Sequence, residues 1–258
     1  MIKFFRNIRR RLLRENRFTR YLIYAIGEII LVVIGILIAL QVNNWNRNIQ
    51  EQKLAKQYLI NIQHDLRQDV QSLDRLEKAV ANRRKAANEV LNNIKSNYYK
   101  NPGLFLVQVD QAGRFGLPQM ARATYEDLIA TGNIQFMEKS IREEVAAYYR
   151  LDDFMKSSQE LQKSRVFEQY LPYAVSAMPL EAQRWVYNIR DANEDPSVYP
   201  DSIIPYADQT LISLRARPEI EDALKAVIRG TWSEDRMIVD YHKAIQELLE
   251  KLQKNLDD

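Results

Sequence analysis

The sequence predicts an all-α protein with a single N-terminal transmembrane helix followed by an elongated antiparallel helical bundle outside the cytoplasm. Three observations support this fold class. Residues 21–42 form one apolar run that contains a single ionisable side chain, Glu28. Glycine and proline are scarce, with 7 and 8 in 258 residues, which is typical of long helices. Beyond the run, apolar residues recur mostly at spacings of three and four, the helical pattern.

The apolar run is long enough to cross a bilayer, because a spanning helix needs roughly 20 apolar residues. A cleaved signal peptide is the competing interpretation. Its apolar core would be about 7–15 residues long and would end at a small-x-small site. The run is longer and ends in Ala-Leu-Gln-Val-Asn, without such a site. We therefore expect an uncleaved signal anchor.

Basic residues at the N-terminus predict which way the anchor points. Residues 1–20 carry eight Lys and Arg side chains against one acid, whereas residues 43–52 hold one Arg and one Glu. Positively charged flanks stay in the cytoplasm. Residues 1–20 are thus expected to be cytoplasmic, and residues 43–258 to lie outside the cytoplasm, which is the periplasm in a cell with two membranes.

The basic segment is also amphipathic, so it is expected either to lie on anionic lipid or only to set the topology. The expected lipid-interface side chains are Arg9, Arg10, Arg11, Arg14, Tyr21 and Trp45.

Charge and composition restrict the function. Residues 1–42 have a net charge of +6 and the whole chain +3, so residues 43–258 sum to −3. A mildly acidic domain argues against nucleic-acid binding. The absence of cysteine excludes disulfides, thiol chemistry and thiolate metal sites.

One face of the membrane helix suggests packing against another helix. At 100° per residue, Glu28, Val32, Gly35 and Ala39 share this face, and Gly35 and Ala39 form a small-xxx-small pair. Three interpretations of Glu28 remain open. It lies in a helix–helix interface, it extends toward the basic membrane surface, or it carries protons.

The external part reads as three long helices joined by irregular segments. The helical pattern covers residues 46–96, continuous with the membrane helix, and then residues 138–171 and 233–255. Residues 97–120 are expected to be mainly loop, with a short strand at 104–109 as the alternative. Shorter helices are expected at 124–134, 180–190, 206–215 and 218–229, and residues 172–205 are the other irregular insertion.

Three local signals refine these bounds. Thr124 is expected to cap the helix at 124–134, with Asp127 completing a variant capping box, and Gly132 is expected to end it. Gly230 is expected to separate the last two helices.

No catalytic, metal or cofactor motif appears, and we expect no enzyme activity and no cofactor. His64 and His242 belong to no His-x-x-x-His or His-x-x-Glu ligand pattern, and are expected to be surface or core-edge residues. Trp185, Tyr187 and Tyr199 in the proline-rich region are candidates either for a ligand cleft or for capping the end of the bundle.

The anchor and one internal segment resemble a family of bacterial single-pass membrane proteins of unknown function. The resemblance rests on YAIGEIILVVIGILIALQ at Tyr24–Gln41, NNWN at Asn43–Asn46 and ATYEDLIATGNIQ at Ala123–Gln135. It implies the same topology and no particular activity.

Three functional hypotheses follow from the sequence. The first is a structural or interaction protein of the cell envelope, which forms a homo-oligomer or docks on another envelope protein. The second is an extracytoplasmic ligand-binding sensor that signals through a partner. The third is a proton-coupled accessory subunit that uses Glu28, an analogy at the level of layout only.

Overall fold

The computed structural model describes residues 18–257, and every regular element in that range is a helix. The all-α prediction is therefore confirmed for the described residues. The chain divides into two units, one ending at Gln57 and the other beginning at Tyr58.

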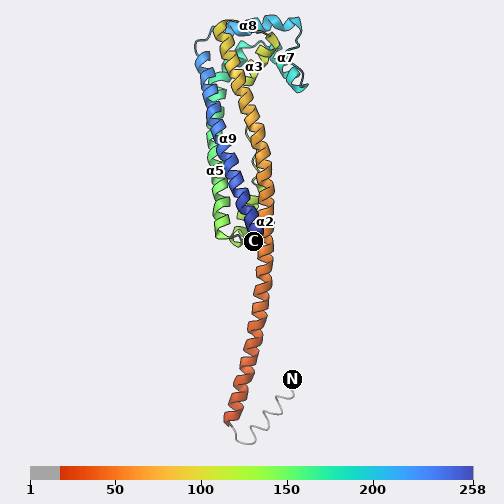
Figure 1. Ribbon diagram of the computed structural model, residues 1–258, viewed down its shortest axis with the longest axis vertical. Helices are drawn as coiled ribbons and strands as arrows, with labels where there is room; N and C mark the ends of the chain where they lie inside the picture. The colour runs from red at the N-terminus through yellow and green to blue at the C-terminus, as the bar shows by residue number, and fades with distance from the viewer. Residues whose placement is uncertain (1–17, 258) are drawn as a thin grey trace. The chain divides into compact units, whose positions relative to one another are not determined.

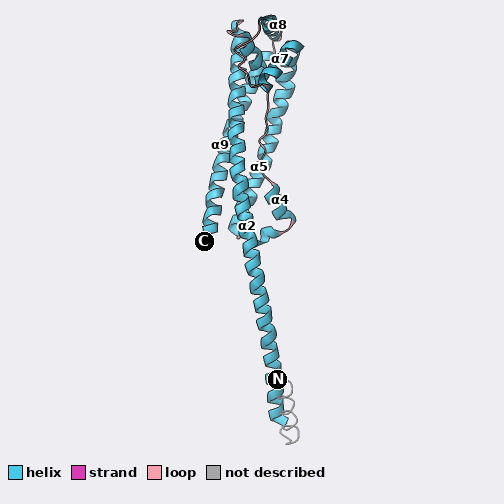
Figure 2. Cartoon of the chain, turned by 90° about the vertical axis from the view of Figure 1, so that its right-hand side faces the viewer, coloured by secondary structure: helices cyan, strands magenta, loops and turns pink. Residues whose placement is uncertain are grey.

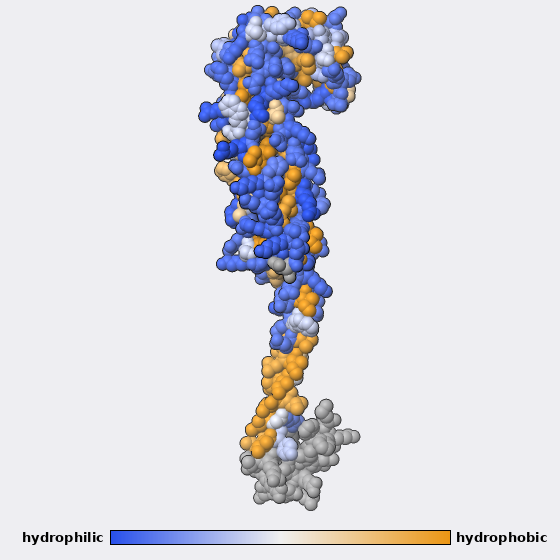
Figure 3. Space-filling model, in the orientation of Figure 1, coloured by the Kyte–Doolittle hydropathy of each residue, from blue (hydrophilic) through white to orange (hydrophobic). Residues whose placement is uncertain are grey.

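The first unit is the N-terminal part of α2 (Phe18–Ser96; Figure 1). Among the described residues, α2 is the one helix long and apolar enough to cross a membrane. None of its most apolar stretch is buried, and Figure 3 shows that stretch as hydrophobic surface. The helix also continues to Ser96 without a break, as the sequence predicts.

Three long helices lie side by side in the second unit: the C-terminal part of α2, α5 (Lys139–Arg165) and α9 (Ile220–Asp257; Figures 1 and 2). In the contacts of α9 with α2 and with α5, residue numbers rise along one helix as they fall along the other, so α9 is antiparallel to both neighbours. Between α5 and α9 the paired residues include Glu144 with Lys251 and Asp152 with Tyr241. Between α2 and α9 they include Gln63 with Gln253 and Arg83 with Glu234.

Shorter helices complete the second unit. They are α3 (Pro102–Ala112), α4 (Ala123–Ala130), η1 (Asn133–Phe136), η2 (Val166–Tyr170), α6 (Leu171–Ala177), α7 (Leu180–Asp191), η3 (Asp201–Ile203) and α8 (Ile204–Arg215). The predicted helix at 180–190 is confirmed as α7.

The hydrophobic core of this unit has two large clusters. One lies among α3, α6, α7 and α8 together with the end of α2 and the start of α9. The other lies among the middle of α2, α4, α5 and the C-terminal half of α9. A small third cluster consists of Leu76, Val80 and Ile238, on α2 and α9.

The prediction for residues 97–120 missed a helix, because α3 occupies residues 102–112 and only the flanking residues are irregular. The side chain of Asn101 accepts a hydrogen bond from the Leu104 backbone N–H at 2.8 Å, and Pro102 follows in the first turn. Both features favour the start of a helix. The apolar 104–109 segment, considered as a strand, lies inside this helix, where Phe105, Leu106 and Val109 are buried.

Two predicted helix ends are also wrong. The helix predicted to stop before Pro172 continues through one π-helical turn, η2, into α6, with Pro172 in the first turn of α6. Gly230 does not break α9. A Cβ atom at this position would lie 2.9 Å from Gln162 Oε1, so the end of the Gln162 side chain from α5 fills the space beside this glycine.

The expected capping box at Thr124 is wrong as well. Helix α4 begins at Ala123 with no side-chain cap, and Asp127 instead accepts a hydrogen bond from the Tyr58 hydroxyl at 2.6 Å. The predicted end at Gly132 is confirmed, since this residue has a φ of 71° immediately after the helix, a conformation that favours glycine.

Candidate functional site

Buried polar side chains of the second unit gather where residues 121–125 contact α2 and α5. Asp69 of α2 is fully buried. Its carboxylate accepts hydrogen bonds from the Ala121 backbone N–H and from the Tyr148 hydroxyl, each at 2.7 Å. This carboxylate thus fixes both the start of the 121–125 segment and α5 on α2.

A second buried carboxylate links α5 with α9. Asp152 is 1% exposed and accepts a hydrogen bond from the Tyr241 hydroxyl at 2.6 Å. It also pairs with Arg122 and, at 2.9 Å, with Lys156 Nζ. Because Arg122 lies next to Ala121, the two carboxylates hold the same segment from two helices.

Aromatic contacts reinforce the attachment. The ring of Tyr125 stacks on that of Tyr149 with centroids 4.0 Å apart, and the Arg122 guanidinium lies 5.5 Å from the centre of the Tyr149 ring. Tyr148 meets Tyr149 edge to face. We call this group of side chains the carboxylate–tyrosine network. Its members are Asp69, Arg122, Tyr125, Tyr148, Tyr149, Asp152 and Tyr241.

The electrostatics of the network follow from burial. Burial raises the pKa of Asp69, although hydrogen bonds from Ala121 and Tyr148 oppose the shift. Burial and the neighbouring carboxylates also raise the pKa of Tyr148 and Tyr241, which keeps both hydroxyls as donors. For Arg122, burial lowers the pKa but pairing with Asp152 outweighs it, and the net shift is upward.

This arrangement favours a structural role for the network. A general acid or base must come within hydrogen-bond reach of a reacting group. Asp69 and Asp152 are enclosed, and their oxygens accept hydrogen bonds from neighbouring side chains or backbone. Buried polar groups that saturate one another in this way position and rigidify the helices that carry them.

A second buried ion pair joins α2 and α9. Arg83 and Glu234 are each 3% exposed and contact one another. Arg83 Nη1 also donates to the Arg114 carbonyl at 3.1 Å, and its guanidinium lies 4.7 Å from the centre of the Phe115 ring. Burial raises the pKa of Glu234 against the opposing effect of Arg83.

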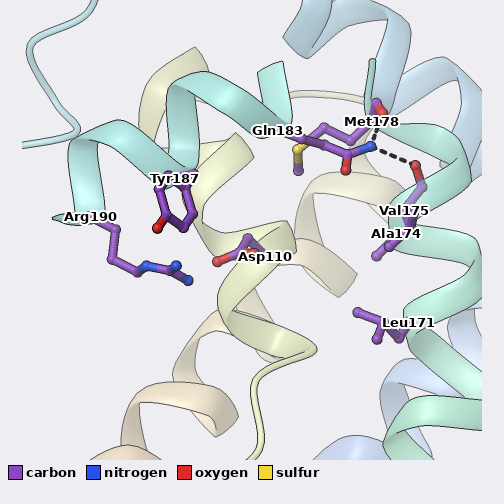
Figure 4. A pocket seen from close by; sticks show the side chains of 8 residues that line it. All are labelled: Asp110, Leu171, Ala174, Val175, Met178, Gln183, Tyr187 and Arg190. Atoms are coloured by element: carbon purple, nitrogen blue, oxygen red, sulfur yellow. Dashed lines mark hydrogen bonds between the residues drawn. The ribbon is translucent and has the colours of Figure 1, made fainter. Parts of the chain in front are cut away.

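A small pocket of about 210 Å³ opens between α3, α6 and α7 (Figure 4). Gln183 is held at its wall by hydrogen bonds to the carbonyls of Val175 at 3.0 Å and Met178 at 2.8 Å. The Arg190 guanidinium lies 4.9 Å from the centre of the Tyr187 ring. The full lining is Asp110, Leu171, Ala174, Val175, Met178, Gln183, Tyr187 and Arg190.

The three aromatic residues predicted for a cleft are not gathered at one place. Trp185 and Tyr199 lie against Gly103 of α3, where an added Cβ would be 2.8 Å from Trp185 Cη2 and 3.3 Å from Tyr199 Cβ. These two side chains therefore pack closely on α3. Tyr187 is 56% exposed and lines the pocket of Figure 4 instead.

The predicted membrane residues belong to the first unit or precede the described chain. Glu28, Val32, Gly35 and Ala39 lie on exposed parts of α2, and Trp45 is 68% exposed. Tyr21 belongs to α2. The predicted lipid-interface arginines Arg9, Arg10, Arg11 and Arg14 lie outside the described residues.

One group of side chains in residues 18–257 has the composition and spacing of a metal site. Asp74 and Glu77 on α2 and His242 on α9 offer ligand atoms that lie within 4.8 Å of one another. Sequence reasoning missed this group because its histidine is distant in the chain and no local ligand motif marks it.

The carboxylate–tyrosine network was missed for the same reason. Its members come from α2, the 121–125 segment, α5 and α9. A signal was present, since Asp69 and Asp152 fall in helices whose apolar residues recur on the same face. An acid on an apolar face predicts a buried, paired carboxylate.

Over residues 18–257 the protein is all-helical, and one helix in that range is long and apolar enough to span a membrane. A family of unknown function (DUF6090) matches residues 28–161, slightly more than half of the chain, and the chain belongs to this family. The matched region contains every network residue except Tyr241. A comparison with curated proteins found no match, and neither did a comparison with solved structures.

Proposed function

We propose that this protein is a membrane-anchored interaction protein of the bacterial cell envelope. Residues 21–42 form its single transmembrane helix, residues 1–20 lie in the cytoplasm, and residues 43–258 form a periplasmic antiparallel bundle. The observation that carries the proposal is the exposed apolar surface of α2 (Figure 3). Removing apolar surface from water gains roughly 25 cal/mol per Å², so lipid or a partner helix is expected to cover it.

The second unit supports an interaction role rather than a catalytic one. Its buried carboxylates Asp69, Asp152 and Glu234 are engaged by groups of neighbouring helices. These contacts of the three carboxylates stabilise the packing of the helices in the second unit. In this proposal the domain presents its surface to a second copy of the chain or to another envelope protein.

The absence of cysteine permits a direct test of the topology. We expect Tyr98→Cys, in an exposed loop position, to react in spheroplasts with a maleimide that does not cross membranes. We expect Asn7→Cys to react only after the membrane is permeabilised. Reaction of Asn7→Cys in intact spheroplasts, or protection of Tyr98→Cys, would contradict the proposed orientation.

The two glycines of the apolar run provide a matched pair for testing assembly. Gly35 belongs to the face that also carries Glu28 and Ala39, whereas Gly27 does not, and neither glycine has a neighbour within 4 Å of an added Cβ. Native mass spectrometry should show that Gly35→Leu weakens a homo-oligomer or a complex with an envelope protein, while Gly27→Leu preserves it. A wild-type chain that is monomeric and without partner in gently extracted membranes would refute the assembly proposal.

The pocket of Figure 4 favours ligand binding as a second candidate function. It combines an apolar floor with Asp110, Gln183 and Arg190, the few polar groups that fix a small molecule in a pocket. A panel of small polar metabolites should then include one that raises the melting temperature of the wild type but not of Tyr187→Ala. A flat response to the whole panel would count against this candidate.

A further inference from the structure

We propose that Asp74, Glu77 and His242 bind a divalent first-row transition ion that joins α2 to α9. The proposal concerns residues 58–257 alone and is independent of the membrane function. Its three ligand atoms lie within 4.8 Å of one another, and they come from two helices that are brought together only by the fold.

The helical positions explain why the two carboxylates converge. Asp74 and Glu77 are three residues apart on α2, and residues at this spacing lie on the same side of a helix. His242 faces them from α9, with its Nε2 atom 3.6 Å from Asp74 Oδ1. The carboxylate of Asp74 is 54% exposed and the imidazole 26% exposed, so an ion has access from solvent.

The distance between His242 and Asp74 is that of an ion pair, and it is also compatible with a shared ion. A hydrogen bond between these atoms would be about 2.7–3.2 Å long, which is shorter than the observed 3.6 Å. Two ligands about 2.1 Å from a tetrahedral ion, the usual distance for zinc with imidazole or carboxylate ligands, lie roughly 3.4 Å apart. These two atoms therefore need little movement to share an ion, while the Glu77 carboxylate, within 4.8 Å of both, has to move closer.

The donor set selects the class of cation. Imidazole nitrogen favours zinc and its first-row neighbours, whereas magnesium and calcium favour oxygen ligands alone. One neutral imidazole and two carboxylates also balance the charge of a divalent ion. Water would complete the coordination sphere of a site that offers three protein ligands.

The test uses the full chain in detergent, without a polyhistidine tag, titrated with ZnCl₂ by calorimetry at pH 7.5. We expect one site in the wild type and a dissociation constant at least about tenfold higher in His242→Ala, Asp74→Asn and Glu77→Gln. His64→Ala is the matched control, because His64 is the other histidine of the chain. It should bind zinc like the wild type, and circular dichroism should show that all variants are folded.

A second measurement tests whether the ion joins the two helices. Zinc should raise the melting temperature of the wild type and of His64→Ala, since an ion that binds only the folded state stabilises it. It should not raise that of Asp74→Asn. Three results would each overturn the proposal: no binding to the wild type, unchanged affinity in His242→Ala, or unchanged affinity in both carboxylate variants. Tighter binding of Mg²⁺ or Ca²⁺ than of Zn²⁺ would overturn the assigned class of ion.

Discussion

Replacing Asp69 tests whether the carboxylate–tyrosine network holds the domain together. In Asp69→Ala the Ala121 N–H and the Tyr148 hydroxyl lose their acceptor inside the protein. Each unsatisfied buried donor costs about 1–3 kcal/mol. The raised pKa of Asp69 shows that burial of its charge is costly, and removing the charge recovers part of the loss. We expect the free energy of unfolding to fall by roughly 2–4 kcal/mol.

The assay is urea unfolding of the full chain in detergent, followed by circular dichroism. Tyr148→Phe and the double variant complete a double-mutant cycle, in which a direct hydrogen bond appears as a coupling energy of roughly 0.5–3 kcal/mol. A loss below about 0.5 kcal/mol in Asp69→Ala, the range of ordinary surface substitutions, would refute the reasoning. Additive effects of the two single variants would refute the specific role of Tyr148.

Limited digestion with trypsin provides a local readout of the same variant. Arg114 and Arg122 flank the segment that Asp69 fixes through Ala121. Loss of that contact should allow this segment to open locally, so that cleavage after either arginine becomes faster. Cleavage at the wild-type rate would show that Arg122, through its pair with Asp152, holds the segment without Asp69.

Three further substitutions test the packing and the electrostatics. Gly103→Ala should destabilise the chain by about 1–3 kcal/mol, measured by urea unfolding, because its Cβ would collide with the Pro196 carbonyl of the backbone. Gly230→Ala should be nearly neutral in the same assay, since the end of the Gln162 side chain can move aside and alanine gains up to about 1 kcal/mol of helix propensity. Burial raises the pKa of Glu234 above its ordinary value of 4.5, so the folded state holds more protons and the unfolding free energy falls as pH rises from 4.5 through the raised pKa. Glu234→Gln should abolish this contribution, and an unchanged pH dependence of the urea midpoint would contradict it.

The long helices could be predicted from sequence because their apolar spacing is continuous. Several of their ends could not, since tertiary contacts decide them. Gly230 resembles a helix break in isolation, but it lies inside α9, where the side chain of Gln162 packs against it. Thr124 resembles an N-cap, but contacts of Ala121 and Arg122 with buried carboxylates position the start of α4.

The candidate sites were harder to predict than the fold, because the residues of each site come from different helices that are far apart in the sequence. In the sequence, Asp74 and Glu77 are two ordinary acids on the exposed side of α2, and only the fold places His242 of α9 beside them. The Asn-Pro start of α3 is the opposite case, since Asn101 and Pro102 are a helix-start signal that is readable from sequence.

We infer that the buried ion pair of Arg83 and Glu234 helps α2 and α9 to keep one register. The apolar cluster halfway along them contains only Leu76, Val80 and Ile238, and aliphatic contacts alone tolerate repacking at modest cost. A slip of one helical turn moves one helix by about 5.4 Å relative to the other. That slip would separate Arg83 from Glu234, and breaking a buried pair costs about 3–5 kcal/mol. The charges therefore penalise wrong alignments more than they stabilise the native one. Replacing both with leucine should cost little stability beyond the lost hydrogen bond of Arg83 to the Arg114 carbonyl, while permitting alternative pairings of the two helices.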